Sequence, residues 1–145
     1  MISASLGSWH VYVCIKLKSG LRFHVVNVYL PPIYSSAIER ECDMWCDLLA
    51  VLGGLPSSEP IVVTGGFNAH LGGHEGVKGL PCPCTICPRQ CLAGHTCSRG
   101  ERLFHMVQDW GWTMCNGCTS LPTYTFARGS SRSSLDYVLL NSKTI

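Results

Sequence analysis

The sequence predicts an α/β fold, and three observations support this class. Residues 9–18 alternate between apolar and polar side chains, which is the period of a half-buried strand. Residues 38–52 repeat apolar side chains every three or four positions, which is the period of a helix. Residues 61–64 are apolar and β-branched, as in a strand buried on both faces. Because the chain has 145 residues, 46% of them hydrophobic, with no repeat or linker, we expect one domain.

The first two predicted strands form a hairpin. Residues 9–18 provide the alternating strand, and residues 21–30 form a second run rich in β-forming side chains. Ser19 and Gly20 supply the turn between them. The double proline at 31–32 ends the second strand, because proline has no N–H to donate to a neighbouring strand.

A helix and a central strand follow the hairpin. Ser36 and Glu39 have the spacing of a capping box, and the two glycines at 53–54 are a typical helix stop. The apolar stripe of this helix consists of Ile38, Cys42, Trp45, Leu49 and Leu52. The strand at 61–64 is followed by Gly-Gly-Phe-Asn-Ala-His at 65–70. We expect functional side chains there, because rigid scaffolds commonly mount them where strands end.

The second half begins with a long aperiodic segment. Residues 72–97 are rich in Gly, Pro and Cys, so we expect a loop or a metal-organised insertion. Ser98 and Glu101 have capping-box spacing at the start of a second helix, and Gly111 ends it. Its apolar stripe consists of Leu103, Phe104, Val107 and Trp110. The remaining predicted elements are a strand at 112–116, an exposed aromatic loop or short strand at 122–126, and a strand at 135–140 that follows an Arg- and Ser-rich run.

The ten cysteines divide into two groups. Five lie in the aperiodic segment, and four of them, Cys82, Cys84, Cys87 and Cys91, offer the soft ligands of a structural zinc site. The spacing does not give two separate C-x₂-C pairs, so a thiol-rich loop without metal is the alternative. The other five are interpreted as core residues, because free cysteine is often buried. They are Cys14, Cys42, Cys46, Cys115 and Cys118.

Composition narrows the class of protein. No apolar run approaches the roughly 20 residues that span a bilayer, and residues 1–9 have neither a basic nor an apolar leader segment. We therefore expect an intracellular protein without a membrane partner. The formal net charge is only +2, so contact with nucleic acid requires a local patch.

Five motifs occur in order along the chain, at residues 27–32, 61–72, 99–103, 122–126 and 134–137. Together they resemble consecutive motifs of the endonuclease/exonuclease/phosphatase superfamily. The version Phe-Asn-Ala-His-Leu-Gly at 67–72, followed by Arg-Gly and a helix, is similar to the endonucleases of non-LTR (LINE-type) retrotransposons. Each motif alone is common, but five in the family's order are hard to obtain by chance.

The resemblance implies a two-sheet α/β sandwich whose strand ends converge on a Mg²⁺-assisted phosphodiester cleft. It implies that Tyr29 contacts the phosphate, that Asn68 steadies the attacking group and that Asp136 orients a histidine. Each residue also has a plain structural interpretation. Tyr29 suits a packed strand, Asn68 a turn, and Asp136 the cap at the start of a strand.

Three departures from the family pattern predict weak or absent cleavage. Gly66 stands where the family motif Gly-Asp-Phe-Asn has its aspartate, and the loss of a general base costs on the order of 10² to 10⁴ in rate. The family's upstream metal-binding glutamate and its closing Ser-Asp-His segment have no counterpart in residues 1–145. We therefore expect a single, partial endonuclease domain at 1–145, with the Cys-rich loop at 72–97. The alternative is a non-catalytic remnant that binds nucleic acid or zinc.

The predicted nucleic-acid surface combines basic and aromatic side chains. Arginines suit phosphates, and exposed aromatic rings suit sugars or bases; a solvated arginine face is the alternative. The residues are Arg99, Arg128, Arg132, Tyr124 and Phe126. The resemblance implies DNA as the partner, a reverse transcriptase encoded in the same element, and a nuclear site of action.

Overall fold

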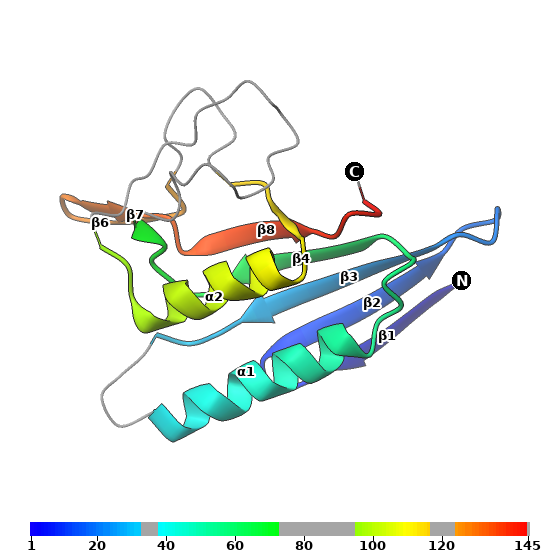
Figure 1. Cartoon of the computed structure of the whole chain (residues 1–145), viewed down its shortest axis with the longest axis horizontal. Coiled ribbons are helices and arrows are strands. Elements are labelled where there is room, and N and C mark those ends of the chain that lie inside the picture. The colour runs from blue at the N-terminus through cyan, green and yellow to red at the C-terminus, as the bar shows by residue number, and fades with distance from the viewer. Residues whose placement is uncertain (33–37, 73–94, 117–123, 145) are drawn as a thin grey trace.

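The computed structural model describes residues 1–32, 38–72, 95–116 and 124–144, and in them the predicted α/β class is confirmed. The elements are β1 (Ile2–Leu6), β2 (His10–Lys16), β3 (Arg22–Tyr29), α1 (Ile38–Gly53), β4 (Ile61–Gly66), α2 (Ser98–Asp109), β5 (Thr113–Met114), β6 (Phe126–Arg128), β7 (Ser131–Ser133) and β8 (Asp136–Leu140). Six strands form one sheet in the order β1-β2-β3-β4-β8-β5, and β6 and β7 form a separate two-stranded sheet (Figure 1).

The predicted hairpin is present as the antiparallel pair β2 and β3, with Val13 opposite Val25. The sequence did not indicate β1, which pairs antiparallel with β2 at the edge of the sheet. All five residues of β1 are exposed. Ile2, Ala4 and Leu6 alternate with serines, but no side chain of this strand is buried, so backbone pairing with β2 holds it in place.

The central strand is β4, as its β-branched run predicted. It runs parallel to β3 and antiparallel to β8. Ile61 and Val63 are buried on one face, and Val62 and Thr64 are half-buried on the other. The carboxyl ends of β3 and β4 therefore lie side by side, next to the start of β8.

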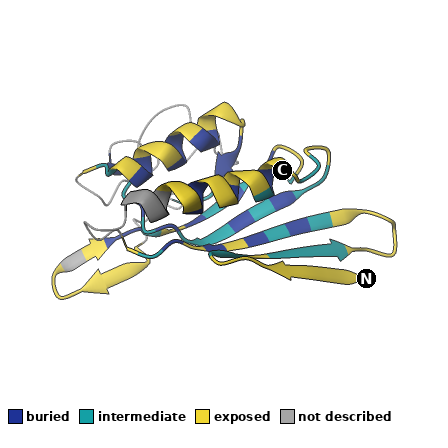
Figure 2. Cartoon of the chain, turned by 90° about the horizontal axis from the view of Figure 1, so that it is seen from below, coloured by how far each residue is buried: buried dark blue, intermediate teal, exposed yellow. Residues whose placement is uncertain are grey.

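Both helices cover the same face of the sheet (Figure 2). Their buried residues join those of β3, β4 and β8 in one core cluster. From the helices this cluster includes Met44, Trp45, Leu48, Leu52, Leu103, Phe104, Met106 and Val107. Trp110, predicted in the buried stripe, is 38% exposed, and Met106 is buried at 6%. The opposite face of the sheet carries half-buried side chains such as Val25, Val62 and Val138.

Three local expectations need correction. The N-cap of α2 is Cys97, whose sulfur accepts a hydrogen bond from Gly100 N, and not the predicted Ser98. The Arg- and Ser-rich run before β8 contributes to the β6–β7 hairpin, with Ala127 opposite Arg132. Cys42 and Cys46, predicted in the core, are exposed on α1, and Cys14 and Cys115 are half-buried. Cys118 lies outside the described residues.

No helix in the described part of the chain is long and apolar enough to cross a membrane.

Candidate functional site

Three of the predicted site positions lie in one row across the sheet. In the register of the strands, Tyr29 at the end of β3 is opposite Gly66 at the end of β4, and Gly66 is opposite Asp136 at the start of β8. Paired residues of neighbouring strands point to the same face. Because Val28 and Tyr137 are buried under the helices, this row lies on the opposite face. Tyr29 is 62% exposed there, and Asp136 is also exposed.

Gly66 occupies the middle of this row. A Cβ at this position would lie 3.1 Å from Asp136 Oδ1 and 3.4 Å from Tyr29 Cδ2. An aspartate at 66 would thus place its carboxylate between the phenol ring and the Asp136 carboxylate. Gly65 differs, since its φ is +126° and a Cβ there would lie 2.1 Å from Val28 O. A side chain fits at 66 with a small shift and does not fit at 65.

Asn68 joins the loops that follow β3 and β4. Its φ is +48°, a conformation that asparagine tolerates better than most residues. Its Nδ2 donates to Leu30 O at 2.7 Å, and Leu30 N donates to Gly66 O at 2.8 Å. Asn68 therefore shapes the strand ends around the row. The role that the resemblance implies for Asn68, which is to steady the attacking group, stays a prediction.

Arg99 has a different place from the one predicted. Its side chain is 1% exposed, and Nη1 donates to Pro31 O at 2.9 Å and to Phe67 O at 3.0 Å. A guanidinium buried against two carbonyls is not available to DNA phosphates, so the assignment of Arg99 to the nucleic-acid surface is wrong. Arg99 instead holds the two loops of the site together.

Asp136 is held through its backbone by two residues that the sequence did not single out. Thr125 Oγ1 accepts hydrogen bonds from Leu135 N at 2.9 Å and Asp136 N at 3.1 Å. Asn116 Nδ2 donates to Asp136 O at 2.7 Å, and Asn116 Oδ1 accepts from Val138 N at 2.8 Å. These contacts leave the carboxylate on the exposed face. Thr125 lies inside the Pro-x-Tyr-Thr-Phe motif at 122–126, between the two aromatic residues that the sequence predicted to contact nucleic acid.

The remaining residues of the predicted nucleic-acid surface are exposed and gather on the β6–β7 hairpin. Tyr124 and Phe126 are 44% and 43% exposed. The Arg132 guanidinium carbon lies 4.7 Å above the centre of the Tyr124 ring. Arg128 is exposed at the hairpin turn. Since Thr125 bonds to the start of β8, this hairpin flanks Asp136.

His70 follows the same motif and lies at the base of the aperiodic segment. Its ring centre is 4.7 Å from that of His95, and its backbone N donates to Cys97 Sγ at 3.2 Å. Leu71 and Thr96 form a β-bridge beside it. Burial lowers the pKa of His70 below its usual 6.5, and the neighbouring His95 lowers it further. The ring is therefore held neutral at pH 7.

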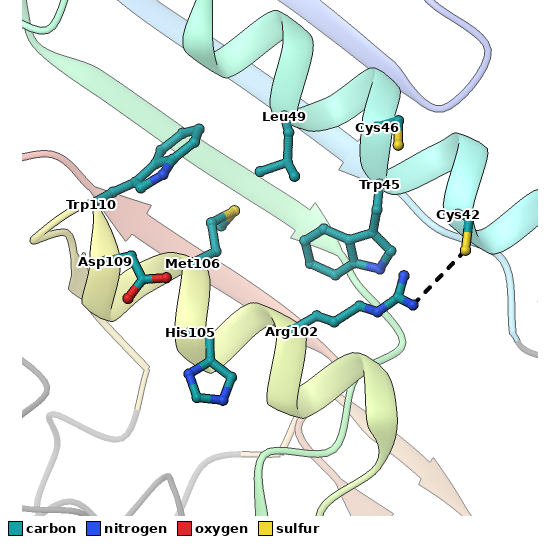
Figure 3. A pocket seen from close by; sticks show the side chains of 9 residues that line it. All are labelled: Cys42, Trp45, Cys46, Leu49, Arg102, His105, Met106, Asp109 and Trp110. Atoms are coloured by element: carbon teal, nitrogen blue, oxygen red, sulfur yellow. Dashed lines mark hydrogen bonds between the residues drawn. The ribbon is translucent and has the colours of Figure 1, made fainter.

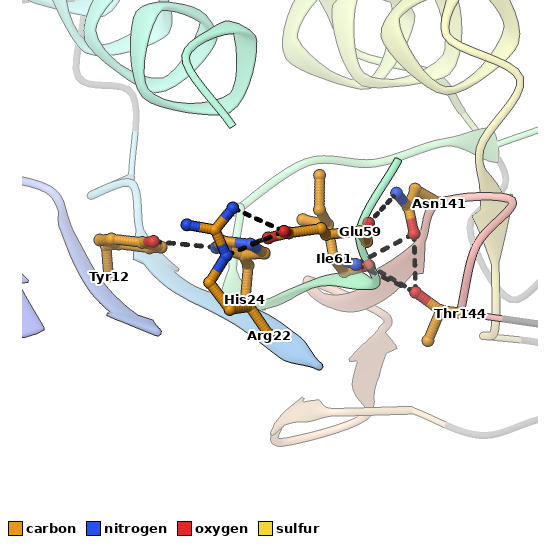
Figure 4. A network of polar contacts seen from close by, with 7 residues as sticks. All are labelled: Tyr12, Arg22, His24, Glu59, Ile61, Asn141 and Thr144. Atoms are coloured by element: carbon orange, nitrogen blue, oxygen red, sulfur yellow. Dashed lines mark hydrogen bonds and ion pairs between the residues drawn. The ribbon is translucent and has the colours of Figure 1, made fainter. Parts of the chain in front are cut away.

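Glu59 does not replace the missing aspartate. It lies before β4, at the far end of the strands from Gly66, and belongs to a polar network (Figure 4). Glu59 Oε2 accepts from His24 Nε2 at 2.5 Å and Oε1 from Arg22 Nε at 2.8 Å. The Tyr12 hydroxyl lies 2.9 Å from His24 Nδ1. His24 first and Arg22 second lower the pKa of the Glu59 carboxyl.

The sequence profile of the Endonuclease/Exonuclease/phosphatase family matches residues 5–144. The chain belongs to this family. A solved structure, the catalytic domain of human Nocturnin with a bound sulfate anion, is similar with a TM-score of 0.50 and 16% sequence identity. The match covers 97% of this chain and 48% of that one, so the chain spans about half the length of the Nocturnin domain. At this identity the likeness shows the fold. No curated protein matches the sequence.

Endonuclease/exonuclease/phosphatase domains generally use divalent metal ions. Mg²⁺ binds oxygen ligands, with one or two carboxylates and several waters or phosphates. The row contains one carboxylate, Asp136, with Gly66 beside it. In the described ranges no group of three or more His, Cys, Asp and Glu side chains is placed to hold a metal. Among the described residues, Asp136 would thus be the single carboxylate of the row that could hold a Mg²⁺, with waters and substrate phosphates completing its ligands. The predicted zinc ligands Cys82, Cys84, Cys87 and Cys91 lie outside the described residues.

Proposed function

We propose that this domain is a phosphodiester-cleaving DNA endonuclease of the non-LTR retrotransposon type whose activity is weak or absent. The observation that carries the proposal is the row of Tyr29, Gly66 and Asp136. The row has the places of a hydrolytic site, at the ends of strands in a domain of the family, and lacks the central acid.

Hydrolysis of a phosphodiester needs three contributions. A water must lose a proton and attack phosphorus, the charge that develops on the phosphoryl oxygens must be neutralised, and the leaving oxygen must be stabilised. In the proposed site the exposed Tyr29 hydroxyl donates a hydrogen bond to a phosphoryl oxygen. Asp136 is the acceptor that remains in the row. Gly66 supplies no base, which costs on the order of 10² to 10⁴ in rate.

The β6–β7 hairpin is the proposed DNA contact. Arg128 and Arg132 are exposed cations, and Tyr124 and Phe126 offer apolar rings beside them. Lysine and arginine contacts to phosphates release counterions, so binding of this kind weakens as salt increases. Because Thr125 connects the hairpin to Asp136, DNA held there would pass over the row.

The second candidate is a nucleic-acid-binding remnant without catalysis. The position of Gly66 favours it, because the hairpin surface is intact while the middle of the row has no side chain. A zinc site formed by the Cys-rich segment would suit either candidate as a structural element. Zinc content of the purified protein, measured by atomic absorption, tests that part separately.

A plasmid-nicking assay separates the two candidates. Supercoiled plasmid is incubated with Mg²⁺ and the wild-type chain, with Gly66→Asp, or with Gly66→Asn as the control of equal size without charge. We expect Gly66→Asp to nick roughly 10² to 10⁴ times faster than Gly66→Asn. Addition of Asp136→Asn should abolish this gain. Salt-sensitive plasmid binding by all variants, with no nicking by any, supports the remnant and contradicts the enzyme.

Descent from a retrotransposon is supported by the Phe-Asn-Ala-His-Leu-Gly motif at 67–72 and the Arg-Gly pair at 99–100. On this basis we propose that a reverse transcriptase is encoded in the same element and that the protein acts in the nucleus. Sequencing of the full transcript tests this directly. A reading frame without a reverse transcriptase on either side would contradict the assignment.

A further inference from the structure

The two helices enclose a pocket on the side of the molecule that the site row does not use. Its volume is about 480 Å³, and it lies between α1 and α2. Trp45 and Leu49 line it from α1, and Met106 and Trp110 from the α2 side (Figure 3). Leu49 and Trp110 are each 38% exposed at its rim. The pocket is therefore an apolar slot that opens to solvent.

One end of this slot has hydrogen-bond donors without a matching acceptor. Trp45 is 4% exposed, and its Nε1 is buried with no hydrogen-bond partner among the described residues. Figure 3 shows this nitrogen on the side of the indole that faces Arg102. The Arg102 guanidinium makes a long contact of 3.9 Å with Cys42 Sγ. A buried donor without an acceptor is destabilising, so this end of the pocket favours an incoming acceptor.

The charges of the pocket select the ligand further. An arginine fork matches the two oxygens of a carboxylate, and a charged acceptor also takes the stronger hydrogen bond from the indole N–H. Asp109 lines the other end of the slot, seven residues and about two turns further along α2. Its carboxylate disfavours a second negative charge there. The arrangement suits one anionic head at Arg102 and an apolar body towards Trp110.

We propose that this pocket binds a small apolar monocarboxylate. Its carboxylate accepts hydrogen bonds from Arg102 and from Trp45 Nε1. Its hydrocarbon part lies along Leu49, Met106 and Trp110. Burial of apolar surface supplies most of the affinity, and the two donors fix the orientation. This site shares no residue with Tyr29, Gly66 and Asp136, so it stands independently of the proposed nuclease.

Titration calorimetry of the full chain with decanoate tests the proposal. 1-Decanol is the matched ligand without charge. Decanoate should bind with 1:1 saturation and decanol about tenfold or more weaker, because hydrogen bonds to charged groups contribute roughly 1.5–3 kcal/mol, or about 10- to 100-fold. Arg102→Gln should weaken decanoate binding by that factor. Lys18→Gln, at an exposed cation in the turn between β2 and β3, should leave it unchanged.

Trp45→Phe keeps an aromatic ring but removes the N–H donor together with part of the indole, so decanoate affinity should fall about tenfold and decanol affinity by a smaller factor. Trp45 is a core residue, and circular dichroism checks that this variant is folded. If it is not, Arg102→Gln on the helix surface still decides. Equal affinities for decanoate and decanol, an unchanged affinity in Arg102→Gln, or the absence of saturable binding would each overturn the proposal.

Discussion

The two ends of strands β3 and β4 contrast in how their polar side chains are used. At the end where β4 begins, Glu59 has two partners, His24 and Arg22, and the Tyr12 hydroxyl completes the chain of contacts. At the other end, Tyr29 and Asp136 flank a glycine and are open to solvent. The first arrangement satisfies its own groups. At the second end, the side chains of Tyr29 and Asp136 stay exposed to solvent.

The loops that follow Tyr29 and Gly66 are nevertheless held by hydrogen bonds to their carbonyls. Arg99 and Asn68 bind the carbonyls of Pro31, Phe67 and Leu30, all behind the exposed row. At this end, buried hydrogen bonds therefore hold the loops, while Tyr29 and Asp136 stay exposed on either side of Gly66.

Replacement of Arg99 should cause the largest loss of unfolding free energy. Arg99→Ala leaves the buried carbonyls of Pro31 and Phe67 without their charged donor, at a cost of roughly 3–5 kcal/mol of unfolding free energy. Urea denaturation measures it. Arg99→Lys should recover part of the loss, and Arg128→Ala on the exposed hairpin should stay within about 0.5 kcal/mol of wild type. A similar loss of unfolding free energy in both alanine variants would show that Arg99 does not hold the two loops together.

A carboxylate introduced at position 66 should repel the Asp136 carboxylate. At pH 7 we expect Gly66→Asp to be less stable than Gly66→Asn by about 1 kcal/mol, because two exposed carboxylates lie close together. Mg²⁺ should remove the difference, since a cation between them offsets the repulsion. Thermal unfolding with and without Mg²⁺ measures both effects. Identical melting of the two variants at every Mg²⁺ concentration would show that position 66 does not face Asp136.

At the end where β4 begins, the ionisation of Glu59 should make stability depend on pH. Its carboxyl pKa lies below the usual 4.5 in the folded protein, mainly because His24 donates to the carboxylate. The stabilising contribution is therefore present above pH 4.5 and is lost as pH falls through the lower folded pKa. Glu59→Gln should be less stable than wild type near pH 6, and the two should converge in acid. Asp47→Asn, on an exposed face of α1, should show no such convergence.

The smallest effect is expected at His70. Burial is the main cause of its lowered pKa, and His95 is the second. His95→Ala should thus raise the pKa of His70 without restoring it to 6.5, as measured by NMR titration of the ring protons. Stability linked to His70 should fall as pH drops from about 6.5 towards its folded pKa, because the unfolded chain takes up the proton first. Full restoration to 6.5 would assign the shift to His95 alone.

The sequence predicted those parts of the fold that bury a periodic surface. The hairpin of β2 and β3, both helices and the central β4 follow from alternation, helical stripes and β-branched residues. The edge strand β1 was missed although Ile2, Ala4 and Leu6 alternate with serines, because a pattern of only five residues is short, and all five are exposed. The cap of α2 was misassigned because a cysteine sulfur took the place that serine usually has. The β6–β7 hairpin was missed because each strand has only 3 residues, too few to show an alternating pattern.

For the candidate site, the sequence indicated Tyr29, Asn68 and Asp136 through motif order, and the strand register brings Tyr29 and Asp136 to either side of Gly66. Their roles stay predictions. Residue type alone does not separate Arg99 from the exposed arginines, since an arginine is usually at the surface and the burial of Arg99 depends on carbonyls far away in the chain. Backbone clamps such as Thr125 and Asn116 also need the tertiary structure to be seen.

The neighbouring glycines at 65 and 66 look alike in the sequence and are constrained in opposite ways. Position 65 admits no other residue, so selection for folding alone preserves it. Position 66 tolerates a side chain with a small shift, so the backbone by itself does not require glycine there. An exchange at position 66 can therefore change the chemistry of the exposed surface between Tyr29 and Asp136 while the backbone around it is inherited unchanged.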